Sequence, residues 1–244
     1  MTDSRDLLRL IRERVPHPAT ARELAQVLRI PREERTSFKR RLKTLADSGE
    51  LLQIRGNRFG LPEKMDLVVG RLHTNPGGFG FVVPEQPAEG ERADIYIAAS
   101  NLTEAMHGDR VVARIERHTP KGLEGRIIRI LERSQETIVG RYEVADGGLG
   151  FVVPFDRRVL TDVHVPTGQS SSAEPGEMVL VEITRWPTAT RGPVGRVTEV
   201  LGTIDEPGVD TQIIIRKFGL PDVHSPESVE EARRLGTLVK EKDI

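Results

Sequence analysis

The chain has 244 residues, of which 37% are hydrophobic and 30% are charged, and it contains no cysteine. This composition suits two or three small domains of ~100 residues each and excludes disulfide scaffolds and thiolate metal sites. No apolar run approaches the ~20 residues of a membrane span, and the first residues do not form a signal peptide. We therefore expect a cytoplasmic protein with no membrane partner.

The net charge of -1 hides an uneven distribution. Residues 1–62 hold fourteen Lys or Arg against eight Asp or Glu, a net +6, which leaves -7 for residues 63–244. A basic first segment is compatible with nucleic-acid binding. Binding by the rest of the chain would have to rely on local patches.

Residues 1–62 predict a winged helix-turn-helix domain. Apolar residues at helical spacing fill 3–15, a capping box at Thr20 and Glu23 opens a second helix, and a third helix follows Pro31. Gly49 ends this helix, and residues 51–59 form a β-hairpin. Three helices and a hairpin are typical of a winged helix, in which the third helix can enter a groove.

The third helix and the hairpin tip are basic, which allows two interpretations. One is a surface that contacts nucleic-acid phosphates, and the other is an ordinary solvated helix face. The candidate contacts are Lys39, Arg40, Arg41, Lys43, Arg55 and Arg58.

Residues 63–203 contain one domain twice. Gly77–Pro84 (GGFGFVVP) returns seventy positions later as Gly147–Pro154 (GGLGFVVP), and three further blocks match in the same order. A self-similarity of this length indicates a duplicated domain. We place the two copies at 63–133 and 134–203, followed by a connector at 204–244.

Each copy predicts about five short strands joined by turns, which favours a small closed barrel of the OB type. The expected fold is therefore mainly β, with an α-rich head, two tandem OB-fold (cold-shock-like) five-stranded barrels and a short helical connector. The expected interior of the first barrel is Val69, Ile95, Ile97, Val112 and Ile115.

Three aromatic residues remain outside this interior set. Phe79 and Phe81 alternate along one strand and so share a face, and Tyr96 lies on a neighbouring strand. They could be core residues. However, the chain has only ten aromatic residues, and three of them fall in this short pattern, which favours a surface platform that stacks bases. The second copy has Leu149, Phe151 and His164 instead, which predicts weaker binding. The candidate RNA contacts are completed by Arg71, His73 and Arg141.

Residues Gly77–Val83 together with Asp94–Ile97 resemble the paired ribonucleoprotein motifs of cold-shock domains. A basic winged helix, two such domains and a segment such as Ile213–Pro221 resemble the amino-terminal layout of ribonuclease R, in the ribonuclease II family. This resemblance implies single-stranded or structured RNA as the partner and Mg²⁺-dependent 3′ to 5′ exoribonuclease activity in a following catalytic domain in cis.

The resemblance also implies that the catalytic aspartate cluster lies beyond this chain, so we expect no catalytic residue, metal ligand or cofactor here and no activity of the chain alone. Two alternatives stay open: a free-standing RNA chaperone or regulator built of the same modules, and a winged-helix DNA-binding protein.

Two acidic segments could either bind a metal ion or form turns. Thr203–Asp210 contains three carboxylates around Pro207 and Gly208, a pair of residues typical of turns. His107-Gly108-Asp109 corresponds to Pro175-Gly176-Glu177 in the second copy, which has no imidazole ligand. We expect turns at both places. A last helix is predicted to begin at Ser225 and end at Gly236, with its apolar side exposed.

Overall fold

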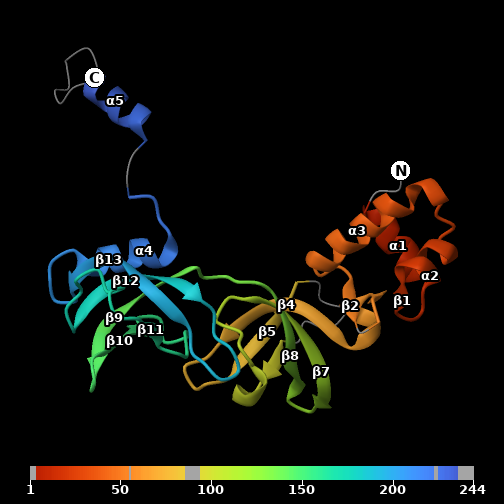
Figure 1. Ribbon diagram of the computed structural model, residues 1–244, viewed down its shortest axis with the longest axis horizontal. Helices are drawn as coiled ribbons and strands as arrows, with labels where there is room; N and C mark the ends of the chain where they lie inside the picture. The colour runs from red at the N-terminus through yellow and green to blue at the C-terminus, as the bar shows by residue number, and fades with distance from the viewer. Residues whose placement is uncertain (1–3, 55, 86–93, 223–224, 236–244) are drawn as a thin grey trace.

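The computed structural model describes residues 4–54, 56–85, 94–222 and 225–235. An α-rich head, two β-barrels and two carboxyl-terminal helices follow one another along the chain (Figure 1). The predicted architecture, mainly β with two five-stranded OB-like barrels, is confirmed. None of the helices in the described part of the chain has the length and apolar character needed to cross a bilayer.

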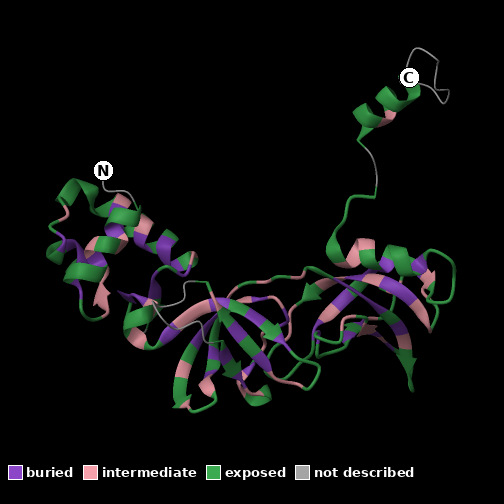
Figure 2. Ribbon diagram, turned by 180° about the vertical axis from the view of Figure 1, so that it is seen from behind, coloured by how far each residue is buried: buried purple, intermediate pink, exposed green. Residues whose placement is uncertain are grey.

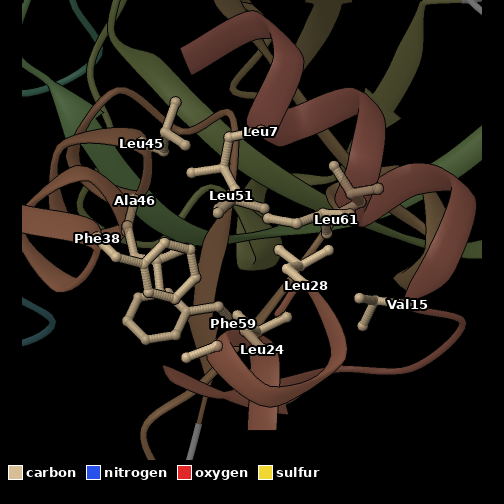
Figure 3. Close-up of a cluster of buried hydrophobic side chains, with 13 residues drawn as sticks. Leu7, Val15, Leu24, Leu28, Phe38, Leu45, Ala46, Leu51, Phe59 and Leu61 are labelled. Carbon is tan, nitrogen blue, oxygen red and sulfur yellow. The ribbon is translucent and has the colours of Figure 1, made fainter. Parts of the chain in front are cut away.

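The head combines three helices with a small antiparallel sheet in the order β1-β3-β2, as the winged-helix prediction requires. Its elements are α1 (Ser4–Arg14), β1 (Ala19–Thr20), α2 (Ala21–Val27), the 3₁₀ helix η1 (Arg32–Glu34), α3 (Arg35–Asp47), β2 (Leu52–Ile54) and β3 (Arg58–Gly60). The capping box is present, because Thr20 Oγ1 accepts from the Glu23 N–H and the Glu23 carboxylate accepts from the Thr20 N–H. Leucines from the helices pack around Phe38 and Phe59 to form the head's core (Figure 3).

The two barrels have the same strand order. The first contains the 3₁₀ helices η2 (Pro62–Met65) and η3 (Ala99–Asn101) and the strands β4 (Leu67–Thr74), β5 (Gly80–Pro84), β6 (Ile95–Ile97), β7 (Arg110–Thr119) and β8 (Gly122–Glu132). The second contains β9 (Thr137–Ala145), β10 (Leu149–Pro154), β11 (Val163–Val165), β12 (Glu177–Arg185) and β13 (Val194–Thr203). Each closes through one parallel pair, β6 with β8 and β11 with β13.

The duplication extends to an internal contact. A Cβ on Gly70 would lie 2.3 Å from the Val83 carbonyl oxygen, and a Cβ on Gly140 would lie 2.3 Å from the Val153 carbonyl oxygen. Only glycine lets these paired strands approach so closely. Gly70 and Gly140 are therefore equivalent residues, and each allows a close approach of two strands in its own barrel.

The expected interior of the first barrel was wrong at two positions. Ile95, Ile97 and Ile115 belong to the barrel cluster, but Val69 and Val112, which are cross-strand partners, face the other way and form a cluster with Leu52 of the head. Val112 lies between Val111 and Ala113, which point inward, and side chains alternate along a strand. The outward valines therefore contact the head. Buried and exposed positions alternate along the strands of both barrels (Figure 2).

The two barrels are joined by buried contacts. Met106, from the loop before β7, belongs to the core cluster of the second barrel. The carboxylate of Asp109, which is fully buried, accepts from Arg133 Nη1 at 2.8 Å and from the main-chain N–H of Ser134 at 3.0 Å. The Arg133 guanidinium in turn lies 4.7 Å from the ring centroid of Trp186 in the second barrel.

The connector differs from its expected form in one respect. Helix α4 (Val209–Phe218) packs on the second barrel, where Val209 and Ile213 join Val139, Met178 and Leu201 in a buried cluster. Helix α5 (Pro226–Leu235) confirms the predicted last helix and stands apart from the barrels (Figure 1). Its residues 226–234 are exposed except for the half-buried Val229, as expected for an unpacked helix.

Candidate nucleic-acid interface

Phe79, Phe81 and Tyr96, which we call the aromatic trio, form one cluster on the first barrel. Phe81 and Tyr96 are direct cross-strand partners on β5 and β6. The three ring centroids lie 5.6 to 5.8 Å from one another, within the range of favourable ring contacts. Phe81 and Tyr96 are each 36% exposed, and Phe79 is half-buried. The trio is therefore at the surface, as the sequence predicted.

The turn before β5 fixes the position of Phe79. The Asn75 N–H donates to the Phe79 carbonyl at 2.7 Å, and the Asn75 side chain accepts from the Gly77 N–H at 2.9 Å. Gly78 has φ of +87°, which a side chain would strain. These bonds close the turn so that Phe79 packs beside Phe81 rather than extending into solvent.

His73 and Arg71 lie on the adjacent strand β4. His73 is exposed and is the direct cross-strand partner of Phe81, so His73, Phe81 and Tyr96 form a row across three strands. Arg71 is exposed, and its Nη1 donates to the Gly108 carbonyl at 3.3 Å. The structure thus brings together all five candidates of the first barrel.

The second barrel places a carboxylate in the equivalent row. Phe151 pairs with His164 on one side and with Glu143 on the other, so Glu143 occupies the position that His73 has in the first barrel. Glu143 Oε1 lies 2.6 Å from Arg141 Nε, and Leu149, at the strand end, is 60% exposed. Sequence reasoning missed Glu143, although the match of Gly70–His73 with Gly140–Glu143 was available to find it.

The basic side chains of the head form a separate surface. Lys39, Arg40 and Lys43 on α3 are exposed, as is Arg58 on β3. Arg41 is half-buried and takes part in an interaction of its own. Arg55 lies outside the described residues. The described members are thus exposed to solvent, except for the half-buried Arg41.

His107 and Asp109 point to different partners. His107 Nδ1 accepts from the Thr74 N–H at 3.2 Å, whereas Asp109 bonds to Arg133 and to main-chain N–H groups. Burial, and after it the charge of Arg158, lowers the pKa of His107, so its imidazole is neutral at pH 7. Gly108 has φ of +86° and the Asp109 N–H donates to the Met106 carbonyl, which confirms the predicted turn.

Two family models match the barrels. The Ribonuclease B OB domain matches residues 70–130, and the Cold shock domain matches residues 151–225. Over 241 residues, or 98% of the chain, the sequence is 33% identical to Ribonuclease R of Acidithiobacillus ferrooxidans. The chain belongs to the ribonuclease R family. Ribonuclease R of Escherichia coli is 36% identical over 88% of the chain.

The chain covers only part of these ribonuclease R proteins. It spans 54% of the Acidithiobacillus ferrooxidans protein and 26% of the Escherichia coli protein. Among solved structures, Mycoplasma genitalium RNase R in complex with ribose methylated single-stranded RNA matches 72% of this chain with a TM-score of 0.58. This match covers 28% of the Mycoplasma genitalium chain. Yeast Ssd1, a pseudonuclease, matches 63% with a TM-score of 0.52, the chain covering 25% of it. Both are 18% identical and share the fold.

The acidic segment at Thr203–Asp210 uses carboxylates in hydrogen bonds of its own. The Glu206 carboxylate accepts from the N–H and the hydroxyl of Thr203, and the Asp210 carboxylate accepts from the Thr211 N–H at 2.7 Å. The predicted turn is therefore confirmed. Within residues 4–54, 56–85, 94–222 and 225–235, no three His, Asp or Glu side chains gather where a metal could bind.

Proposed function

We propose that this member of the ribonuclease R family binds single-stranded RNA on the first barrel and passes it to a catalytic domain in cis. The observation that carries the proposal is the aromatic trio, three rings held at the surface of adjacent strands. Every base has a π-face, so such a platform binds single strands with little sequence preference. Mg²⁺-dependent hydrolysis from the 3′ end belongs, in this proposal, to the catalytic domain.

Each side chain of the first barrel has a role in this binding. The trio stacks successive bases, the His73 ring extends the row next to Phe81, and the Arg71 guanidinium meets the phosphate backbone. In the second barrel, Phe151 and His164 retain part of the row, but the Glu143 carboxylate repels phosphate and neutralises Arg141. The exposed basic side chains of the head add contacts to structured RNA.

A titration of labelled RNA tests this function. At the same salt concentration, we expect the chain to bind single-stranded RNA at least ~10-fold more tightly than duplex DNA of the same sequence. The reason is that only unpaired bases can stack on the trio. Fluorescence anisotropy at two salt concentrations measures both affinities. Tighter binding of the duplex would contradict the proposal and favour a winged-helix DNA-binding protein.

Glu143→Gln is expected to strengthen RNA binding by about 2- to 5-fold. The substitution removes a negative charge from the row and releases Arg141, and surface charge interactions contribute ~0.2–1 kcal/mol. The matched control is Glu182→Gln, which makes the same charge change at the Arg196 ion pair. An equal gain in the control would mean that net charge, and not the Glu143 position, limits binding.

A further inference from the structure

A second pair of exposed aromatic rings lies on the second barrel. Phe218, the last residue of α4, is 59% exposed, and Phe155, directly after β10, is 44% exposed. They are the most exposed aromatic side chains among the described residues. Lys217 Nζ lies 5.3 Å from the Phe218 ring centroid and 5.9 Å from that of Phe155, so one cation contacts both rings. We call Phe155, Lys217 and Phe218 the α4 site.

Main-chain and ion-pair contacts hold the α4 site in place. The Phe155 N–H donates to the Val139 carbonyl at 2.9 Å, and Ile213, on the same helix as Phe218, is fully buried against the barrel. Lys217 Nζ lies 3.1 Å from Asp156 Oδ2. The two rings and the ammonium group are therefore positioned by a strand, a helix and a salt bridge, and not by a loose loop.

A series of direct contacts joins the α4 site to the strand that carries His73. The Asp156 carboxylate accepts from Arg158 Nε at 3.0 Å and from Arg158 Nη2 at 2.7 Å. The Arg158 main-chain carbonyl accepts from Thr74 Oγ1 at 2.5 Å. Thr74 follows His73, which is the partner of Phe81 in the trio. The two aromatic sites are thus linked by a chain of direct contacts across the joint between the barrels.

The charges along this connection favour a polyanion. The connection carries three positive charges, on Arg157, Arg158 and Lys217, and one negative charge on Asp156. Asp156 forms ion pairs with both Arg158 and Lys217. The Arg158 hydrogen bond, together with the Lys217 bond, lowers the pKa of Asp156 far below its usual range, so this carboxylate stays ionised and holds both cations. Rings that alternate with basic groups match the bases and phosphates of a single strand.

We infer that single-stranded RNA continues from the aromatic trio across the joint and stacks a further base at the α4 site, on Phe155 and Phe218, with Lys217 meeting a phosphate. This inference rests on the proposed function of the trio and adds a second subsite on the same path. A strand too short to span the joint occupies the trio alone, whereas a longer strand engages both subsites. Affinity is therefore expected to rise with RNA length.

The test compares a short and a long oligouridylate, about 4 and about 16 nucleotides, the range of OB-fold site sizes. In Phe155→Ala/Phe218→Ala, the long RNA is expected to bind ~10-fold or more weakly, while the affinity for the short RNA is unchanged. The matched control is Ile214→Ala/Leu220→Ala, which removes two exposed aliphatic side chains at 43% and 48% exposure from the same end of the chain. Both RNAs are expected to bind this control normally.

Three outcomes would overturn the inference. They are unchanged binding of the long RNA, an equal loss for both lengths, and an equal loss in the aliphatic control, which would show that the loss does not come from the two aromatic rings. Circular dichroism melts verify that each variant is folded. The Phe79→Ala/Phe81→Ala variant tests the proposed function separately. If the trio binds RNA, this variant loses binding of the short RNA, whereas Phe155→Ala/Phe218→Ala does not.

Discussion

Phe79→Ala/Phe81→Ala is expected to weaken binding of single-stranded RNA by at least about 30-fold. Each base stacked on an aromatic side chain contributes ~1–3 kcal/mol, and ~1.4 kcal/mol corresponds to a factor of ten. Phe81 is exposed and Phe79 is half-buried at the surface, so neither truncation opens a barrel core. Fluorescence anisotropy with a labelled single strand measures the loss, and a circular dichroism melt verifies the fold.

The duplicated barrel supplies the control for this experiment. Leu149→Ala/Phe151→Ala changes the equivalent positions of the second barrel, where Glu143 adjoins Phe151. We expect its affinity to change by less than about threefold. Equal losses in the two variants would show that the barrels bind alike, and an unchanged affinity in the first variant would exclude the trio as the binding surface.

Asp109→Ala is expected to lower the free energy of unfolding by about 3 kcal/mol. The Asp109 side chain is 1% exposed and Arg133 is 20% exposed, and removal of one partner of a buried ion pair typically costs ~3–5 kcal/mol. Three donors, Arg133 Nη1 and the N–H groups of Met106 and Ser134, lose their acceptor. Trp186, the only tryptophan, contacts Arg133, so its fluorescence during urea unfolding measures the effect at the joint.

Glu177→Ala is the control, because Glu177 has the corresponding place in the second barrel. Its carboxylate accepts from the Glu174 N–H at 2.7 Å, but this bond is at the surface. We expect a loss of no more than about 1 kcal/mol. A similar loss in both variants would mean that the carboxylate supports only the turn and that its bond to Arg133 adds nothing.

The parts of the fold that follow from local rules could be predicted from the sequence. The capping box at Thr20, the glycine turns and the period-2 alternation of Phe79 and Phe81 each depend on neighbouring residues. The internal copy added the size of the barrels, because a motif that recurs after seventy residues must belong to a repeating unit. These local rules and the internal copy are sufficient to predict the aromatic trio from the sequence.

The parts that depend on contacts between units could not be predicted in this way. Val112 is as apolar as its inward neighbours, and only the presence of the head explains its outward position. The sequence predicts only a connector around Ile213, because nothing local indicates that α4 covers the second barrel. The ion pair of Arg141 with Glu143 joins residues two places apart on one strand, and the charge of Arg141 alone does not reveal it.

Met106 gives the joint a mechanical property. This side chain starts in the first barrel and ends in the core of the second, and Arg133 bonds to Asp109 on one side while it contacts Trp186 on the other. Moving the barrels apart would leave a hole in the core of the second barrel and would break the contact between Arg133 and Trp186. We therefore expect the two barrels to move together when tension in a bound strand acts on one of them.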